Sequence, residues 1–151
     1  QLGIVTHKEK EAKNWINKIN EARKQLPALP NAPTVAYFIW RKPWMVAGNH
    51  TYIHEFLNLC GFQNAFGEQS RYPEVELKKL GDKKIDIVFL SSEPFPFKDK
   101  HIEELKEYLP VAHIKLINGE MFSWYGSRMK KGFQYASRLV EAYKQEIQHK
   151  P

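Results

Sequence analysis

Three short apolar segments limit what this chain can fold into more than any other feature of its sequence. They are TVAYFIW at residues 34–40, IDIVFL at 85–90 and HIKLI at 113–117, each rich in β-branched or aromatic residues. The first two are apolar at nearly every position, which is typical of strands buried on both faces. Helical patterns separate the three segments, and strands that alternate with helices predict a mostly parallel sheet. The sequence therefore predicts a three-layer α/β/α lobe.

A long amphipathic helix and a proline-rich linker precede these strands. The apolar spacing predicts the helix over residues 7–25, with Thr6 as its N-cap. The segment LPALPNAP that follows contains three prolines, which end a helix. We therefore divide the chain into a connecting helix with its linker, residues 1–30, and an α/β lobe, residues 31–151.

Further helices are expected between and after the strands. A helix over residues 51–60 would be closed by Gly61 in the C′ position. Pro73 would open a short helix that ends at Leu80. Two more helices are expected, one over residues 98–109 and one at the end of the chain with Phe133, Ala136, Leu139, Val140, Tyr143 and Ile147 on one face.

The composition excludes several classes of protein. Of the 151 residues, 42% are hydrophobic and 26% are charged, which is typical of a globular domain and not of a disordered chain. A single cysteine, Cys60, excludes an intrachain disulfide and a cysteine-based zinc cluster. No apolar run approaches the ~20 residues that span a bilayer. The net charge of +6 is spread along the chain, and Lys alternates with Glu in stretches such as HKEKEAK, which indicates solvated helix faces.

Aromatic side chains gather in the loops that follow the three predicted strands. These loops are WRKPWMVAGN, SSEPFPFK and NGEMFSWYGSR, and loops after parallel strands meet at one edge of a sheet. Rings on a cleft wall give a large, stiff contact area for a bulky, flat ligand. We therefore expect one rim formed by Trp40, Trp44, Phe95, Phe97, Phe122, Trp124 and Tyr125.

Two carboxylates in the same loops leave an enzyme open as an alternative. Glu93 and Glu120 follow the second and third strands at similar offsets, so they would face each other as the acid and the nucleophile or base of a glycosidase. No further carboxylate or orienting network is legible around them, and we favour polar anchoring of a ligand over catalysis.

Other site patterns are weaker. His50 and His54 have a spacing that suits one metal ion, but no third ligand follows, and Ser91–Ser92 lacks a nucleophile elbow. A single-stranded nucleic-acid module would use the rings together with Arg41, Lys42, Lys98 and Arg128. Because the same loops also contain glutamates, we rank this nucleic-acid alternative below the binding of a bulky ligand.

Five motifs in order along the chain resemble one known family. They are IWRKPWMVAG, TYIHEFL, RYPEVELKKL, LSSEPFPFKDKHIEEL and GEMFSWYGSR, and the resemblance covers residues 35–139. The chain resembles the C-terminal lobe, with part of the inter-lobe helix, of a helical-backbone (cluster A, class III) periplasmic binding protein. Within that superfamily it is similar to the cobalamin-binding and iron-chelate-binding receptors of ABC importers.

The resemblance implies a binding protein and not an enzyme, without a cofactor of its own. Its partners would be a metal chelate (cobalamin, a ferric siderophore or haem), an ABC transporter permease and an N-terminal lobe that this chain lacks. It would be periplasmic, or a lipoprotein anchored to a membrane and facing the exterior. No nucleic acid is expected as a partner.

The resemblance also suggests which residues contact the ligand and the permease. By motif, the ligand contacts are Trp44, Met45, Tyr72, Glu120, Ser123 and Trp124. By position in the same loops we add Trp40, Arg41, Glu93, Phe95, Phe97 and Tyr125. The receptors dock on their permease through a surface glutamate that aligns with Lys78, so Glu74 or Glu76 would have to replace it.

Overall fold

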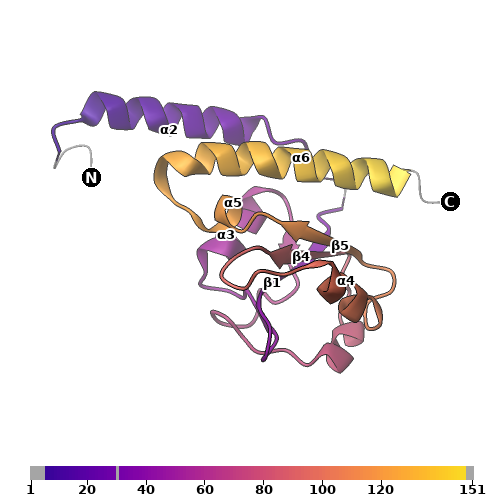
Figure 1. Ribbon diagram of the computed structural model, residues 1–151. Coiled ribbons are helices and arrows are strands. Elements are labelled where there is room, and N and C mark those ends of the chain that lie inside the picture. Colours follow the sequence, from indigo (N-terminus) through magenta and orange to yellow (C-terminus); the bar gives the residue numbers. More distant parts are fainter. Residues whose placement is uncertain (1–5, 30, 149–151) are drawn as a thin grey trace. The chain divides into compact units, whose positions relative to one another are not determined.

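The computed structural model describes residues 6–29 and 31–148 (Figure 1). The chain divides into two compact units. The larger unit is Leu29–Ser123, and the smaller one combines residues 1–28 with residues 124–151.

A five-stranded, mostly parallel sheet forms the centre of the larger unit, which confirms the predicted fold class (Figure 1). Its main strands are β1 (Thr34–Trp40), β4 (Ile87–Ser91) and β5 (His113–Ile117), and β4 is parallel to both of its neighbours. Two short strands share the other edge of β1. β3 (Gln63–Asn64) runs parallel to its start, and β2 (Met45–Val46) runs antiparallel near its end. The sequence predicted β1 and β5 at the observed residues, whereas β4 begins two residues later than expected.

One face of the sheet is covered by an apolar core that includes the helix α4 (Asp99–Lys106). Phe38 of β1 and Leu90 of β4 pack there with Leu105 of α4, and all three are fully buried. Leu80, from the 3-10 helix η1 (Leu77–Asp82), joins the same cluster. Full burial of one such side chain contributes about 1.5–3 kcal/mol, so this core fixes α4 and η1 on the sheet.

The opposite face of the sheet is covered by aromatic rings from α3 (Tyr52–Leu59) and α5 (Glu120–Ser123). The ring of Phe122 lies 5.6 Å from Tyr37, 5.8 Å from Phe89 and 5.2 Å from Phe56. All four rings are fully buried. The larger unit therefore contains three layers by itself, with helices on both faces of the sheet.

Caps explain why α3 begins and ends where it was predicted. Thr51 Oγ1 accepts a hydrogen bond from His54 N at 3.1 Å, which satisfies a free N–H of the first turn. After Cys60, Gly61 adopts a φ of +85°, a backbone conformation that favours glycine at C′. The helix expected over residues 73–80 is wrong in type and start, because that segment instead contains η1.

The smaller unit contains α2 (Glu9–Lys24), the 3-10 turn η2 (Gly126–Arg128) and α6 (Met129–Gln148), and α2 packs along α6. The predicted cap at Thr6 is wrong: the N-cap of α2 is Lys8, and its side chain makes no capping hydrogen bond. Trp15 and Ile16 of α2 are 43% and 56% exposed. No helix in the part of the chain that the structure describes is long and apolar enough to cross a membrane.

Candidate functional site

A hollow of about 560 Å³ lies at the carboxyl ends of the parallel strands, and we call it the strand-end hollow. β1 ends at Trp40, β4 at Ser91 and β5 at Ile117, so the segments that follow them leave the sheet at one edge. The hollow is lined by Tyr37, Ile39, Ile53, Tyr72, Glu93, Pro94 and Ser123.

Serine hydroxyls join the loops after β4 and β5. Ser91 Oγ donates to the carbonyl oxygen of Glu93 at 2.6 Å and accepts from the Glu93 N–H at 3.2 Å. Ser92 Oγ accepts from the Gly119 N–H at 3.0 Å, and Ser123 Oγ donates to the Gly119 carbonyl at 2.6 Å. We call these four residues with Gly119 the loop clasp. These bonds hold the two loops from which Glu93 and Ser123 line the hollow, so the serines have a structural role and not that of a nucleophile.

The clasp requires glycine at position 119. A Cβ built on Gly119 would clash with Ser91 Oγ and would lie 3.0 Å from the Glu93 nitrogen. Such distances are shorter than packed atoms tolerate, so the close approach of the two loops depends on the missing side chain.

Phe122 and Phe97 are buried in the core and do not belong to an exposed rim. Phe122 is fully buried behind the hollow, and Phe97 is only 6% exposed because it lies in the core cluster on the opposite face of the sheet. The expectation that all the loop aromatics line one rim is therefore wrong for these two rings. Burying an aromatic ring stabilises the fold more than leaving that ring exposed to water. Rings in a short loop at the end of a sheet therefore pack into the core before they contribute to an exposed rim.

Trp40, Trp44 and Phe95 form a continuous ring contact with Phe97. Trp40 lies 5.7 Å from Phe95, which lies 4.8 Å from Phe97, and Trp44 stacks on Phe97 at 5.7 Å with an interplanar angle of 17°. Trp40 is 39% exposed, whereas Trp44 and Phe95 are half-buried. The first two aromatic loops therefore meet, as the sequence predicted.

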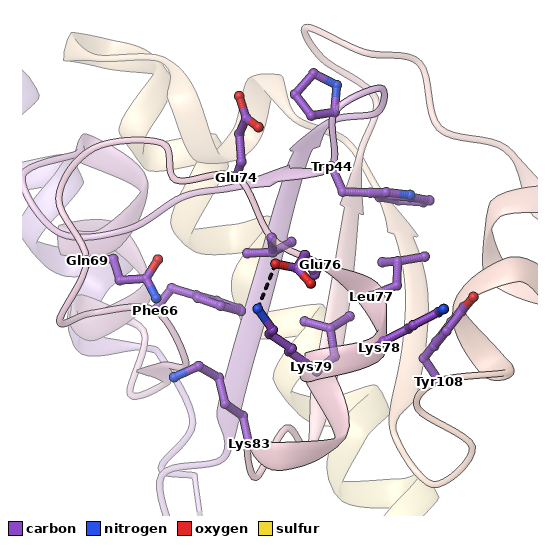
Figure 2. A pocket seen from close by; sticks show the side chains of 13 residues that line it. Trp44, Phe66, Gln69, Glu74, Glu76, Leu77, Lys78, Lys79, Lys83 and Tyr108 are labelled. Atoms are coloured by element: carbon purple, nitrogen blue, oxygen red, sulfur yellow. Dashed lines mark hydrogen bonds and ion pairs between the residues drawn. The ribbon is translucent and has the colours of Figure 1, made fainter.

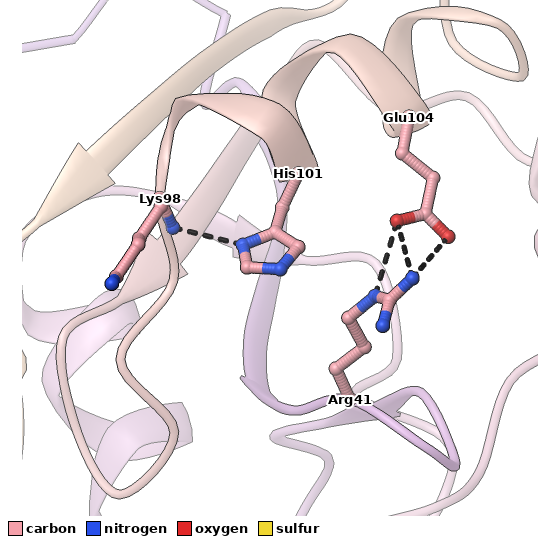
Figure 3. Close-up of polar contacts among 4 residues, drawn as sticks. All are labelled: Arg41, Lys98, His101 and Glu104. Carbon is pink, nitrogen blue, oxygen red and sulfur yellow. Dashed lines mark hydrogen bonds and ion pairs between the residues drawn. The ribbon is translucent and has the colours of Figure 1, made fainter.

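Arg41 is held by an acidic partner that the sequence did not suggest. Its Nε and Nη2 donate to the two carboxylate oxygens of Glu104 on α4, each at 3.0 Å (Figure 3). Both side chains are half-buried, and the guanidinium carbon lies 5.5 Å from the ring centre of Trp44. This forked pair ties the loop after β1 to α4.

A buried histidine stabilises the start of the same helix. His101 Nδ1 accepts from the Lys98 N–H at 2.9 Å (Figure 3). Its ring is packed among Trp44, Phe95 and Phe97 at 5.4–6.5 Å. Burial, followed by the positive charge of Arg41, lowers the pKa of His101.

A second hollow of about 880 Å³ lies beside η1, and we call it the flank hollow. Figure 2 shows Trp44, Leu77 and Tyr108 among its lining side chains. Its charged residues are Glu74, Glu76, Lys78, Lys79 and Lys83. The predicted permease contacts Glu74 and Glu76 are therefore both on this hollow, and Trp44 lines it too.

The remaining predicted contacts are dispersed. Met45 pairs with Glu74 in a β-bridge and with Trp40 in the sheet, and Glu120 is the half-buried first residue of α5. Trp124 and Tyr125 belong to the smaller unit, where they are 45% and 70% exposed. There the guanidinium carbon of Arg128 lies 4.2 Å from the Trp124 ring centre.

The two histidines with metal-ligand spacing contact different groups. His50 Nδ1 lies 3.4 Å from Ser70 Oγ, whereas the ring nitrogens of His54 lie 3.0 Å from Asn58 and 3.2 Å from Asn64. Within residues 6–29 and 31–148 no three His, Cys, Asp or Glu side chains cluster in a way that would hold a metal ion. Burial raises the pKa of Cys60 to about 12, so this thiol is not reactive.

Tyr37, Ile39, Ile53 and Pro94 line the strand-end hollow but were not among the predicted contacts. The alternation of side chains along a strand could have identified two of them. Tyr37 and Ile39 alternate with Phe38 and Trp40 along β1, so they point to the same face of the sheet near the end of the strand. Ile53 reaches the hollow from α3, and no short-range pattern indicates that.

Comparison with known proteins identifies relatives of this arrangement. The sequence profile described as "Periplasmic binding protein" matches residues 1–116. No curated protein matches the sequence.

Several solved structures share the fold. A possible iron-binding (periplasmic solute-binding) protein from Staphylococcus epidermidis superposes with a TM-score of 0.75 at 20% identity, over 93% of this chain and 57% of its own. The periplasmic heme-binding protein HutB of Vibrio cholerae gives 0.69 at 19% identity, over 95% and 60%. The vitamin B12-binding protein BtuF of Vibrio cholerae gives 0.67 at 14% identity, over 91% and 55%. The chain therefore spans less than two thirds of the length of these proteins.

Proposed function

The chain belongs to the periplasmic binding protein family, and from this premise we propose that it captures a solute at the strand-end hollow for delivery to an importer. The observation that carries the proposal is this hollow, whose loops are joined by the clasp at the edge where parallel strands end. Hydrogen-bonded loops are ordered before the ligand arrives, so little conformational entropy is lost on binding.

The solute we propose is a bulky metal chelate. The similar structures are described as binding iron, heme and vitamin B12. Tyr72, Glu93 and Ser123 line the strand-end hollow in this chain, and Trp40 presents an exposed ring that contacts Phe95. Those groups offer flat apolar contact together with a few polar anchors, which suits a chelate with an apolar body and a polar edge. Arg41, Trp44, Met45, Glu120, Trp124 and Tyr125 remain proposed contacts, whereas Phe97 is buried in the core and is not proposed again.

We also propose that the hollow is one wall of a cleft and that a second lobe supplies the other wall. The chain spans only 55–60% of the similar structures, and α2 exposes Trp15 and Ile16 as apolar surface for a neighbour. The protein would then act in the periplasm, or as an anchored lipoprotein facing the exterior. Its permease contacts would include Glu74 and Glu76.

An enzymatic role is not supported, because this family consists of binding proteins and not enzymes. Glu93 and Glu120 remain candidates for ligand anchoring. No observation favours the nucleic-acid alternative.

Calorimetric titration of the 151-residue chain with cyanocobalamin, haemin and a ferric trihydroxamate tests the proposal. Because the chain supplies only one wall of the proposed cleft, we expect at least one chelate to bind saturably with a dissociation constant above about 1 μM. Tyr72→Ala should weaken it, whereas Tyr108→Ala, which removes a similar ring from the flank hollow, should not. No saturable binding, or equal losses in both variants, would overturn the proposal.

A further inference from the structure

Two hydroxyl groups that line the strand-end hollow, those of Tyr37 and Ser123, donate their protons within the protein. The Glu93 carbonyl can only accept, so Ser91 must donate to it, and Ser91 Oγ must therefore accept from the hydroxyl of Tyr37 at 3.2 Å. The hydroxyl proton of Ser123 is likewise committed to the Gly119 carbonyl. Neither Tyr37 nor Ser123 therefore has a hydroxyl proton left to donate to a guest.

No described residue that lines the hollow carries a positive charge. Among the described residues that line it, Glu93 alone is charged, and its carboxylate is exposed and forms no ion pair with any of them. Arg41 follows β1 directly, but its guanidinium is engaged by both oxygens of Glu104. An anionic guest would therefore meet a carboxylate without a compensating cation.

We propose that the guest of this hollow carries N–H or O–H donors and no net negative charge, and that Glu93 is the residue that selects for this. The inference rests on the proposed function and adds the chemical class of chelate. An amide-fringed or amine-bearing chelate donates charge-assisted hydrogen bonds to Glu93. A chelate with carboxylates or catecholates at its edge is repelled by the same group.

A matched series of chelates separates charge from shape. Ferrioxamine B ends in a primary amine, its N-acetyl derivative ends neutrally, and its N-succinyl derivative ends in a carboxylate, while the ferric hydroxamate core is the same. Cyanocobalamin and its monocarboxylic acids form a second pair that differs in one amide. At low salt and pH 7, affinity should fall by about tenfold from the positive to the negative member of the series.

Variants of Glu93 attribute this preference to one side chain. Glu93→Gln should reduce the tenfold difference in affinity between the positive and the negative chelate. Glu93→Lys should reverse the order of the affinities. Glu107→Gln removes the same charge at the C-cap of α4, outside the residues that line the hollow, and should leave the tenfold difference unchanged. Because the Glu93 side chain is exposed and its clasp bonds use backbone atoms, the variants should unfold at the wild-type temperature.

The outcomes separate this inference from the function on which it rests. If chelates bind but the anionic member binds as well as the cationic one, or if Glu93→Lys leaves the order unchanged, the charge selection is wrong and the proposed function stands. If no member of either series binds, the proposed function fails and the inference fails with it.

Discussion

The strand-end hollow and the flank hollow differ in charge more than in size. The flank hollow is the larger, about 880 Å³ against about 560 Å³, yet two glutamates and three lysines line it. Two of these charges form an ion pair, with Lys79 Nζ 2.7 Å from Glu76, whereas Lys83 Nζ lies 5.2 Å from the centre of the uncharged Phe66 ring. The strand-end hollow has one carboxylate, and no described residue pairs with it.

This difference shows that volume alone does not identify a ligand site. Paired surface charges are well solvated, and a guest that displaces their water gains little. Apolar walls give a guest contact area, and a polar group without a protein partner fixes the orientation of the guest. The predictions below test whether the two hollows are distinct in this way.

The largest effect is expected behind the strand-end hollow, from Phe122→Ala. The ring is fully buried against Tyr37, Phe56 and Phe89, so its loss should lower the free energy of unfolding by about 3–5 kcal/mol. Chemical denaturation measures this change. Tyr125→Ala serves as the control, since that ring is 70% exposed, and a similar loss there would contradict the assignment.

Gly119→Ala should distort the strand-end hollow and leave the flank hollow unchanged. The added methyl group would clash with Ser91 and crowd Glu93, which should cost about 1–3 kcal/mol of unfolding free energy. Ligand affinity should fall as well, since Glu93 is displaced. Gly81→Ala is a matched control, because no atom lies within 4 Å of a Cβ at that position in η1. Equal losses in both variants would show that the clasp does not matter.

The stability of the chain should depend on pH through His101. Burial and Arg41 lower its pKa below the ordinary value of 6.5, so the unfolded chain takes up the proton first. Stability is therefore complete above pH 6.5 and falls as the pH drops toward the lowered pKa, by at most about 1.4 kcal/mol per pH unit. Denaturation curves between pH 7.5 and pH 5 should show a slope that His101→Phe reduces. An unchanged slope would exclude this histidine as the cause.

Breaking the forked ion pair should have a smaller effect. Glu104→Gln leaves one hydrogen bond to Arg41 possible and should cost about 1 kcal/mol, because both side chains are partly exposed and solvent screens them. The loss should shrink in high salt, and thermal unfolding at two salt concentrations measures it. A loss that is unaffected by salt would point to packing.

The smallest effect is expected at the flank hollow, from Lys79→Met. The pair with Glu76 lies on the surface, with side chains 70% and 69% exposed, so removing it should leave the unfolding temperature and the ligand affinity unchanged. A marked loss of affinity would mean that the flank hollow, and not the strand-end hollow, receives the guest.

The strands and the capped helix α3 were predictable from the sequence because local chemistry determines them. Strand β1 is apolar along its length, and Thr51 and Gly61 satisfy the ends of α3. The start of β4 and the 3-10 turn at Leu77–Asp82 depend on tertiary packing, since Leu80 is buried in a core that the local pattern does not reveal.

The candidate site was predicted only in part, because an aromatic ring in a loop can either pack into the core or line an exposed rim. The sequence indicated the loops, and Tyr72, Glu93 and Ser123 line the strand-end hollow. The sequence could not show that Phe97 and Phe122 are buried on opposite faces of the sheet. The face on which each ring packs depends on where the rest of the core leaves space for it. The ion pair of Arg41 with Glu104 spans 63 residues of sequence, and no spacing rule indicates it.

Backbone amide shifts of the ¹⁵N-labelled chain during titration with cyanocobalamin test the central claim most directly. The account predicts that the amides of Ile39, Tyr72, Glu93 and Ser123 shift together with one dissociation constant. Shifts confined to residues 74–83 around the flank hollow would contradict it.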